Sequence, residues 1–141
     1  MSKFSLDREC ALDLIRRYGL STGDLVVEVG SGDGGFLQAM QACGVRVLGI
    51  EPDMQAMSRA WTEGIDTLAV HFGPGAADYI RAKYGAVKLL VARSVKPGTE
   101  EFARLLAGSR CLTADGVIAI LSAGVNAVVE VRPDPAHRRA A

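Results

Sequence analysis

Val26-Val27-Glu28-Val29-Gly30-Ser31-Gly32-Asp33-Gly34-Gly35 passes from a continuous apolar run, typical of a strand covered on both faces, into a glycine-rich turn. A second apolar run, residues 45–50, leads into Glu51-Pro52-Asp53. Glycine allows a sharp turn and lets a ligand lie against the backbone without meeting a Cβ atom. An acid at the end of the next strand can accept hydrogen bonds from a ribose. Together the two segments predict a nucleoside site at the carboxyl edge of a parallel sheet.

Strand-like and helix-like segments alternate along the rest of the chain. Strands are predicted for residues 25–29, 45–50, 66–70, 87–91 and 117–121, with a sixth apolar stretch at 127–131. Helices are predicted for residues 7–18, 35–43, 54–63, 76–84 and 99–109, and Asp53 is the expected N-cap of the third helix. This alternation predicts an α/β fold with a doubly wound, mostly parallel Rossmann-like sheet. Because only about 20 residues follow the fifth strand, we expect the sheet to be shortened at its C-terminal edge.

Length and composition indicate one folded domain. We expect a single domain over residues 1–141, with its core at 22–121 and a frayed tail at 133–141. Sixteen basic and sixteen acidic residues balance, so no overall field draws the chain to nucleic acid or to an anionic membrane. The apolar runs are too short to cross a bilayer, and the N-terminus lacks the apolar core of a signal peptide. We therefore expect a cytoplasmic protein.

The cysteines give no sign of a metal site. Cys10, Cys43 and Cys111 are widely spaced and match neither a metal-ligand pattern nor a disulfide framework. We expect free thiols in a reducing compartment and no bound metal.

Two nucleoside cofactors compete for the glycine-rich turn. Gly30, Gly32 and Gly35 satisfy G-x-G-x-x-G, and Glu51 follows about 20 residues later, so a dinucleotide fingerprint is formally present. Such a site uses a helix N-terminus and free N–H groups to hold phosphate. Glu28 and Asp33 would repel a pyrophosphate, whereas they suit the ammonium group of S-adenosylmethionine. The residues thus favour S-adenosylmethionine, and NAD(P) stays open as an alternative.

The same residues resemble the class I S-adenosylmethionine-dependent methyltransferases, most closely the core domain of the sugar C-methyltransferases. The resemblance covers roughly residues 22–121. It is carried by Asp24-Leu-Val-Val-Glu-Val-Gly-Ser-Gly-Asp-Gly-Gly-Phe-Leu-Gln-Ala and Ala42-Cys-Gly-Val-Arg-Val-Leu-Gly-Ile-Glu-Pro-Asp. It implies that Glu28, Gly30 and Gly32 border the methionyl group, that Glu51 binds the ribose, and that Pro52 and Asp53 lie beside the adenine. The remaining expected cofactor-binding residues are Ser31, Asp33, Phe72 and Ala92.

Candidate residues for the methyl acceptor follow the third and fourth predicted strands. His71 could act as a general base near neutral pH, and its neighbour Phe72 could pack against the adenine or fill the core. Arg93 and Ser94 stand where this fold places residues between cofactor and acceptor. Arg93 stays protonated and so cannot be a base, but it could bind an anionic acceptor. The catalytic residues are therefore unknown, with His71, Arg93 and Ser94 as candidates.

The leading functional prediction is methylation of a small molecule, with S-adenosylmethionine as cofactor and S-adenosylhomocysteine as product. Two alternatives stay open: a cofactor-binding or interaction module of the same fold without effective catalysis, and an NAD(P)-binding Rossmann domain. An apolar strand exposed at the shortened edge of the sheet would need a cover, which suggests a homodimer.

Overall fold

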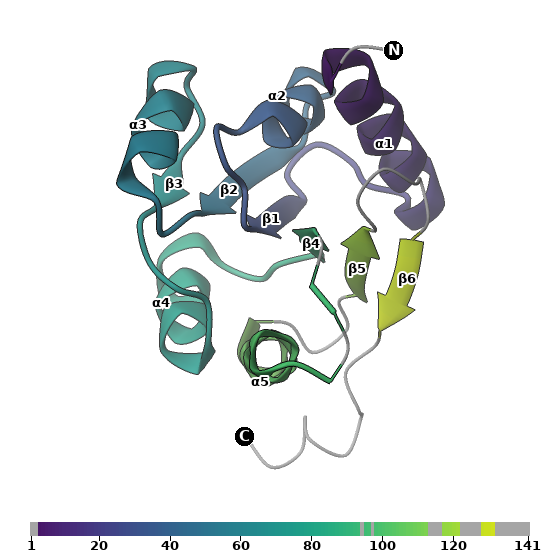
Figure 1. Ribbon diagram of the computed structural model, residues 1–141. Coiled ribbons are helices and arrows are strands. Elements are labelled where there is room, and N and C mark those ends of the chain that lie inside the picture. The colour runs from purple at the N-terminus through teal and green to yellow at the C-terminus, as the bar shows by residue number, and fades with distance from the viewer. Residues whose placement is uncertain (1–2, 94, 97, 113–116, 122–127, 132–141) are drawn as a thin grey trace. The chain divides into compact units, whose positions relative to one another are not determined.

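The computed structural model describes residues 3–93, 95–96, 98–112, 117–121 and 128–131 (Figure 1). The chain forms two compact units, Met1–Val70 and His71–Ala141. The tail predicted at 133–141 lies outside the described residues. Within the described part, no helix has the length and apolar character needed to cross a membrane.

The first unit alternates helices and parallel strands. β1 and β2 pair in parallel, with Glu28 opposite Gly49, and β2 and β3 pair in parallel, with Gly49 opposite Thr67. The strand order is therefore β3-β2-β1. Helix α1 packs on α2, α2 on β2 and α3 on β3 (Figure 1). The elements are α1 (Lys3–Tyr18), β1 (Leu25–Val29), α2 (Gly35–Ala42), β2 (Arg46–Ile50), α3 (Met54–Thr62) and β3 (Thr67–Leu68).

Helix α1 begins about one turn earlier than the predicted residue 7. Asp7 therefore lies inside the helix, and it shares a buried face with Ala11 and Leu14 at the four- and three-residue spacing of a helix. The strand predicted at 66–70 is shorter than expected, because only Thr67 and Leu68 pair with β2. The predicted bounds of β1 are confirmed.

The second unit continues the alternation. Its elements are α4 (Pro74–Tyr84), β4 (Leu89–Arg93), α5 (Glu100–Leu112), β5 (Val117–Leu121) and β6 (Val128–Val131). β4 and β5 are parallel, whereas β6 runs antiparallel to β5, with Ile118 opposite Val131. Helices α4 and α5 pack on each other. The prediction of an α/β fold with mostly parallel strands is thus confirmed.

The predicted positions of β4 and α5 are corrected. β4 begins at Leu89 rather than at residue 87, although Val87 is already buried. Helix α5 continues past residue 109 to Leu112, which is fully buried. Within the helix the Ser109 hydroxyl donates to the Leu106 carbonyl at 2.7 Å. Thr99 caps the start of α5, where its hydroxyl accepts from the Phe102 N–H at 3.1 Å.

Candidate functional site

The turn after β1 leaves an open backbone surface. Gly30 and Gly32 have φ angles of 77° and 59°, which side chains rarely adopt. A Cβ atom at either position would meet nothing within 4 Å. These two glycines are therefore needed for their conformation, and the space beside them is free for a ligand.

Hydrogen bonds from the turn fix it to the end of β2. The Ile50 carbonyl accepts from the N–H of Gly30 at 2.8 Å and from the N–H of Ser31 at 3.2 Å. Ser31 is 7% exposed, and its Oγ has no hydrogen-bond partner within the described residues. A Cβ atom on Gly49 would collide with the Ser31 side chain. Gly49 in β2 therefore makes the space into which the turn packs.

The Glu51 carboxylate joins the turn to the segment after β2. Its Oε1 accepts from the N–H of Gly32 at 2.9 Å, and its Oε2 accepts from the N–H of Asp53 at 2.9 Å. A carboxylate offers about four acceptor positions, so further hydrogen bonds from a ligand remain possible. Glu51 is half-buried. The geometry therefore holds a pre-oriented acceptor beside the open glycine surface.

The predicted N-cap of α3 is confirmed. Asp53 Oδ1 accepts from the N–H groups of Gln55 at 2.9 Å and Ala56 at 3.4 Å. Pro52 and Asp53 are exposed. Together with Glu51 they place three consecutive predicted site residues beside the turn.

The two remaining predicted acids of this unit differ in environment. Glu28 is 1% exposed and lies within β1. Asp33 is exposed, and its Oδ1 accepts from the N–H of Gly35 at 3.3 Å. The structure thus gathers the predicted site residues from 28 to 33 and from 51 to 53 in the first unit.

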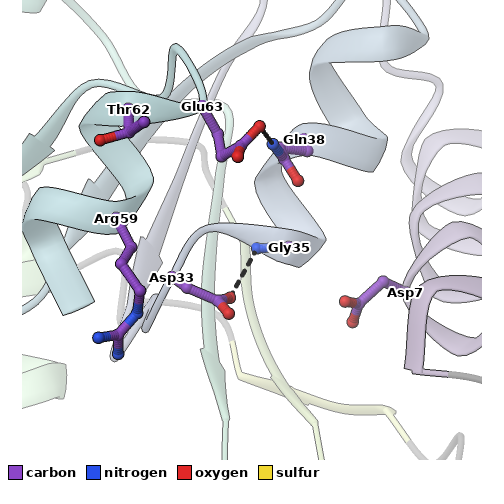
Figure 2. A pocket seen from close by; sticks show the side chains of 7 residues that line it. All are labelled: Asp7, Asp33, Gly35, Gln38, Arg59, Thr62 and Glu63. Carbon is purple, nitrogen blue, oxygen red and sulfur yellow. Dashed lines mark hydrogen bonds between the residues drawn. The ribbon is translucent and has the colours of Figure 1, made fainter.

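A pocket of about 470 Å³ opens on the helical side of the turn (Figure 2). Two of its lining residues are joined by a hydrogen bond, in which the side-chain amide of Gln38 donates to the Glu63 carboxylate at 3.3 Å. Its acidic side chains come from α1, from the turn and from the residue that follows α3, and Arg59 is its one basic lining residue, so the lining holds more acidic than basic side chains. The lining residues are Asp7, Asp33, Gly35, Gln38, Arg59, Thr62 and Glu63.

Asp7 is a residue of this region that the sequence analysis missed. It is 4% exposed, which is rare for an aspartate. Its Oδ2 lies 2.8 Å from the position that a Cβ atom on Gly35 would take. The sequence signal was the spacing to Ala11 and Leu14, which places an acid on the buried face of α1.

The other predicted residues belong to the second unit. His71 is exposed, and Ala92 is fully buried in β4. Phe72 is 7% exposed, and a Cβ atom on Gly108 would lie 2.8 Å from its ring atom Cζ, so the ring packs against α5. Arg93 is the last residue of β4, and Ser94 lies outside the described residues.

Metal and disulfide chemistry find no support in the described part of the chain. No group of three or more His, Cys, Asp or Glu residues there is placed to hold a metal ion. Cys10, Cys43 and Cys111 form no disulfide with one another.

Comparison with known proteins gives one curated relative with a clear sequence match. No family model matches the sequence. This chain is 31% identical to the C-methyltransferase NovU of Streptomyces niveus over 104 residues, which is 73% of this chain. The match spans 25% of that relative, so the chain corresponds to about a quarter of its length.

Solved structures share the fold at lower sequence identity. An S-adenosylmethionine-dependent methyltransferase from Anabaena variabilis matches with a TM-score of 0.65 and 20% identity, over 86% of this chain and 54% of that chain. The sugar N-methyltransferase KedS8 from Streptoalloteichus matches with a TM-score of 0.63 and 13% identity, over 86% of this chain and 49% of that chain. At these identities the likeness shows a common fold, and the chain spans about half of each structure.

Proposed function

We propose that this chain, which has the fold of the class I S-adenosylmethionine-dependent methyltransferases, binds S-adenosylmethionine at the glycine turn and serves the methylation of a small molecule. The observation that carries this proposal is the hydrogen bond from the Gly32 N–H to Glu51. It sets an acceptor for a ribose directly beside a backbone surface that no side chain covers.

Each part of the site has a proposed task. Glu51 accepts hydrogen bonds from the ribose hydroxyls, and Pro52 and Asp53 flank the adenine. Glu28 lies in the strand that leads into the turn, where a carboxylate favours the ammonium group of the methionyl part. When bound, S-adenosylmethionine supplies a methyl group on a cationic sulfur. The remaining proposed cofactor contacts are Gly30, Ser31, Gly32, Asp33, Phe72 and Ala92.

The acceptor is proposed from the relatives. NovU is a C-methyltransferase and KedS8 is a sugar N-methyltransferase, which supports a small molecule such as a sugar as the acceptor. His71, Arg93 and Ser94 are the proposed acceptor-side residues. A homodimer, a cytoplasmic location and a single domain over residues 1–141 complete the proposal.

Isothermal titration tests the cofactor assignment directly. We expect S-adenosylhomocysteine to bind with a dissociation constant on the micromolar scale, about −8 kcal/mol in binding free energy. NAD is the control ligand, because it shares the adenosine and adds a pyrophosphate. Binding of NAD without binding of S-adenosylhomocysteine would replace the proposal with the dinucleotide alternative.

A further inference from the structure

The side chain of Ser31 packs onto the sheet, whereas its two neighbours in the turn leave open space. A Cβ atom on Gly30 or Gly32 would meet nothing within 4 Å. The Ser31 side chain, by contrast, crowds the position that a Cβ atom on Gly49 would take, and its own Cβ lies 3.0 Å from that position. Ser31 is buried, so its side chain is packed between the turn and β2. The turn therefore rests on β2 at Gly49.

Gly49 is held in the sheet from both sides, opposite Glu28 of β1 and Thr67 of β3. Its N–H donates to the Asp66 carbonyl at 2.9 Å. Thr67 is 3% exposed, and its Oγ1 donates to the Ile65 carbonyl at 3.1 Å. A methyl group at position 49 would lie 3.0 Å from that oxygen. Because the strands and Thr67 are fixed in this way, they resist displacement by a larger residue at position 49.

The glycine turn is held less firmly than the strands. Ser31 Oγ finds no hydrogen-bond partner among the described residues. The Ile50 carbonyl accepts from the N–H groups of both Gly30 and Ser31, and the second bond is already 3.2 Å long. The Gly32 N–H donates to the side chain of Glu51, which can follow a small shift. A side chain at position 49 would therefore displace the turn rather than the strands.

We propose that Gly49 is a positioning residue for the cofactor. By leaving room for Ser31, it sets how closely the glycine turn approaches β2. Gly30 and Gly32 of that turn are the proposed neighbours of the methionyl group, so this inference rests on the proposed function. Gly49 makes no contact of its own with the ligand and acts through the turn that it supports.

The proposed ribose contact depends less on the height of the turn. The Glu51 N–H donates to the Leu68 carbonyl at 2.9 Å, which ties the backbone of Glu51 to β3. A displaced turn should therefore weaken binding of the amino-acid part of the ligand more than binding of its adenosine part. S-adenosylhomocysteine and 5′-methylthioadenosine separate the two effects, because the second keeps the adenosine and the thioether but lacks the amino-acid part.

Isothermal titration with both ligands, at a temperature where each variant is folded, tests the proposal. We expect Gly49→Ala to weaken binding of S-adenosylhomocysteine about tenfold and binding of 5′-methylthioadenosine by no more than about threefold. In a Ser31→Gly background, Gly49→Ala should change the S-adenosylhomocysteine constant by less than about twofold, because the side chain that it displaces is gone. A tenfold loss in that background as well would place the cause elsewhere and overturn the proposal.

Gly44→Ala is the matched control. Gly44 precedes β2 at the opposite end of the strand and has a φ of 90°. A Cβ atom there would meet Thr22 Oγ1 at 3.5 Å, which is an ordinary contact. Alanine therefore lowers stability through its backbone conformation without displacing the turn, and both affinities should stay within about twofold of wild type. An equal loss of S-adenosylhomocysteine binding in Gly44→Ala would show that lowered stability alone weakens binding, against the proposal.

The remaining outcomes separate this inference from the proposed function. If wild type does not bind S-adenosylhomocysteine, the proposed function fails, and this inference fails with it. If wild type binds it and Gly49→Ala binds both ligands equally well, only this inference is overturned. Should Gly49→Ala not fold, Ser31→Gly carries the test. That change removes the support of the turn and frees its backbone, so it should weaken S-adenosylhomocysteine binding about threefold and 5′-methylthioadenosine binding less than about twofold, and wild-type affinity for both would overturn the proposal.

Discussion

Glu51 and Gly32 are joined by a hydrogen bond across a sequence separation of 19 residues: the Gly32 N–H donates to Glu51 Oε1 at 2.9 Å. The second oxygen accepts from the N–H of Asp53, also at 2.9 Å. One carboxylate thus connects the turn after β1 with the start of α3. Its removal affects both the proposed ribose contact and the connection between the two segments.

We expect Glu51→Ala to weaken binding of S-adenosylhomocysteine by about 1.5–3 kcal/mol, the range for losing hydrogen bonds to a charged group. Glu51→Gln should cost less, because its amide oxygen can still accept one of the bonds. Isothermal titration measures both, with Glu63→Gln as a control that removes a carboxylate away from the ribose position. Unchanged affinity in Glu51→Ala would contradict ribose binding by this residue.

The packing of Ser31 against Gly49 predicts a loss of stability in Gly49→Ala. The new methyl group would collide with the Ser31 side chain and lie 3.0 Å from Thr67 Oγ1. Overpacking of this kind costs about 1–3 kcal/mol, measured as the free energy of unfolding in urea. The additional change Ser31→Gly should recover part of that loss, because the two sites are coupled.

Gly75→Ala is the control for that experiment. Gly75 lies in α4, and a Cβ atom there would meet nothing within 4 Å. Alanine should therefore raise stability by about 0.5 kcal/mol through its better helix propensity. A similar loss in both variants would mean that the cost at Gly49 does not come from contact with Ser31.

The sequence predicted elements best where pairing and burial coincide. The run of β1 is bounded by Asp24 and Gly30, and its predicted bounds match the structure. In β4, burial and strand pairing begin at different residues, because Val87 is already buried whereas pairing begins at Leu89. Hydrophobicity reports burial alone, so the predicted strand began too early.

The candidate site likewise combines residues that local motifs predict with residues whose contacts depend on tertiary packing. The turn and Glu51 are local motifs, and the sequence placed them together correctly. The burial of Asp7 follows the helical spacing to Ala11 and Leu14, whereas its approach to Gly35 depends on how α1 packs on α2, a tertiary contact that no local pattern specifies. Phe72 was left open between adenine and core, and its packing against Gly108 depends on the approach of α5.

Asp53→Ala should destabilise the first unit through the loss of the α3 N-cap. The Asp53 carboxylate satisfies the N–H groups of Gln55 and Ala56, and loss of such a cap costs about 1 kcal/mol. Asp53→Asn keeps a side-chain acceptor and should retain most of the stability. Urea unfolding compares the three proteins, and equal loss in both variants would argue against a capping role.

Cys111 predicts a pH dependence of stability in alkaline solution. Burial, and then the nearby Asp78 carboxylate, raises the pKa of the Cys111 thiol above its ordinary value of 9.0. Since the folded-state pKa is the higher one, its contribution to stability is complete below about pH 9 and is lost as the pH rises through the folded-state pKa.

Cys111→Ala should therefore lose less stability than wild type when the pH rises above that point. The measurement is the free energy of unfolding in urea over a series of alkaline buffers. Cys43→Ala is the matched control, because Cys43 is exposed. If wild type and both variants show the same pH dependence, the Cys111 thiol does not contribute to it.

The last prediction concerns turnover. The segment Ala92-Arg93-Ser94-Val95-Lys96-Pro97 contains no His, Tyr or acid, and Arg93 stays protonated, so a strong base is missing there. Proximity alone can still supply a large part of the barrier reduction for an acceptor that needs no deprotonation. We expect the chain by itself to bind S-adenosylhomocysteine but to methylate typical nucleotide sugars slowly or not at all. His71 is exposed, so His71→Ala should leave cofactor affinity nearly unchanged. A methyl-transfer assay decides the matter: rapid multiple turnover that disappears in His71→Ala, with cofactor affinity preserved, would identify His71 as the base and overturn this expectation.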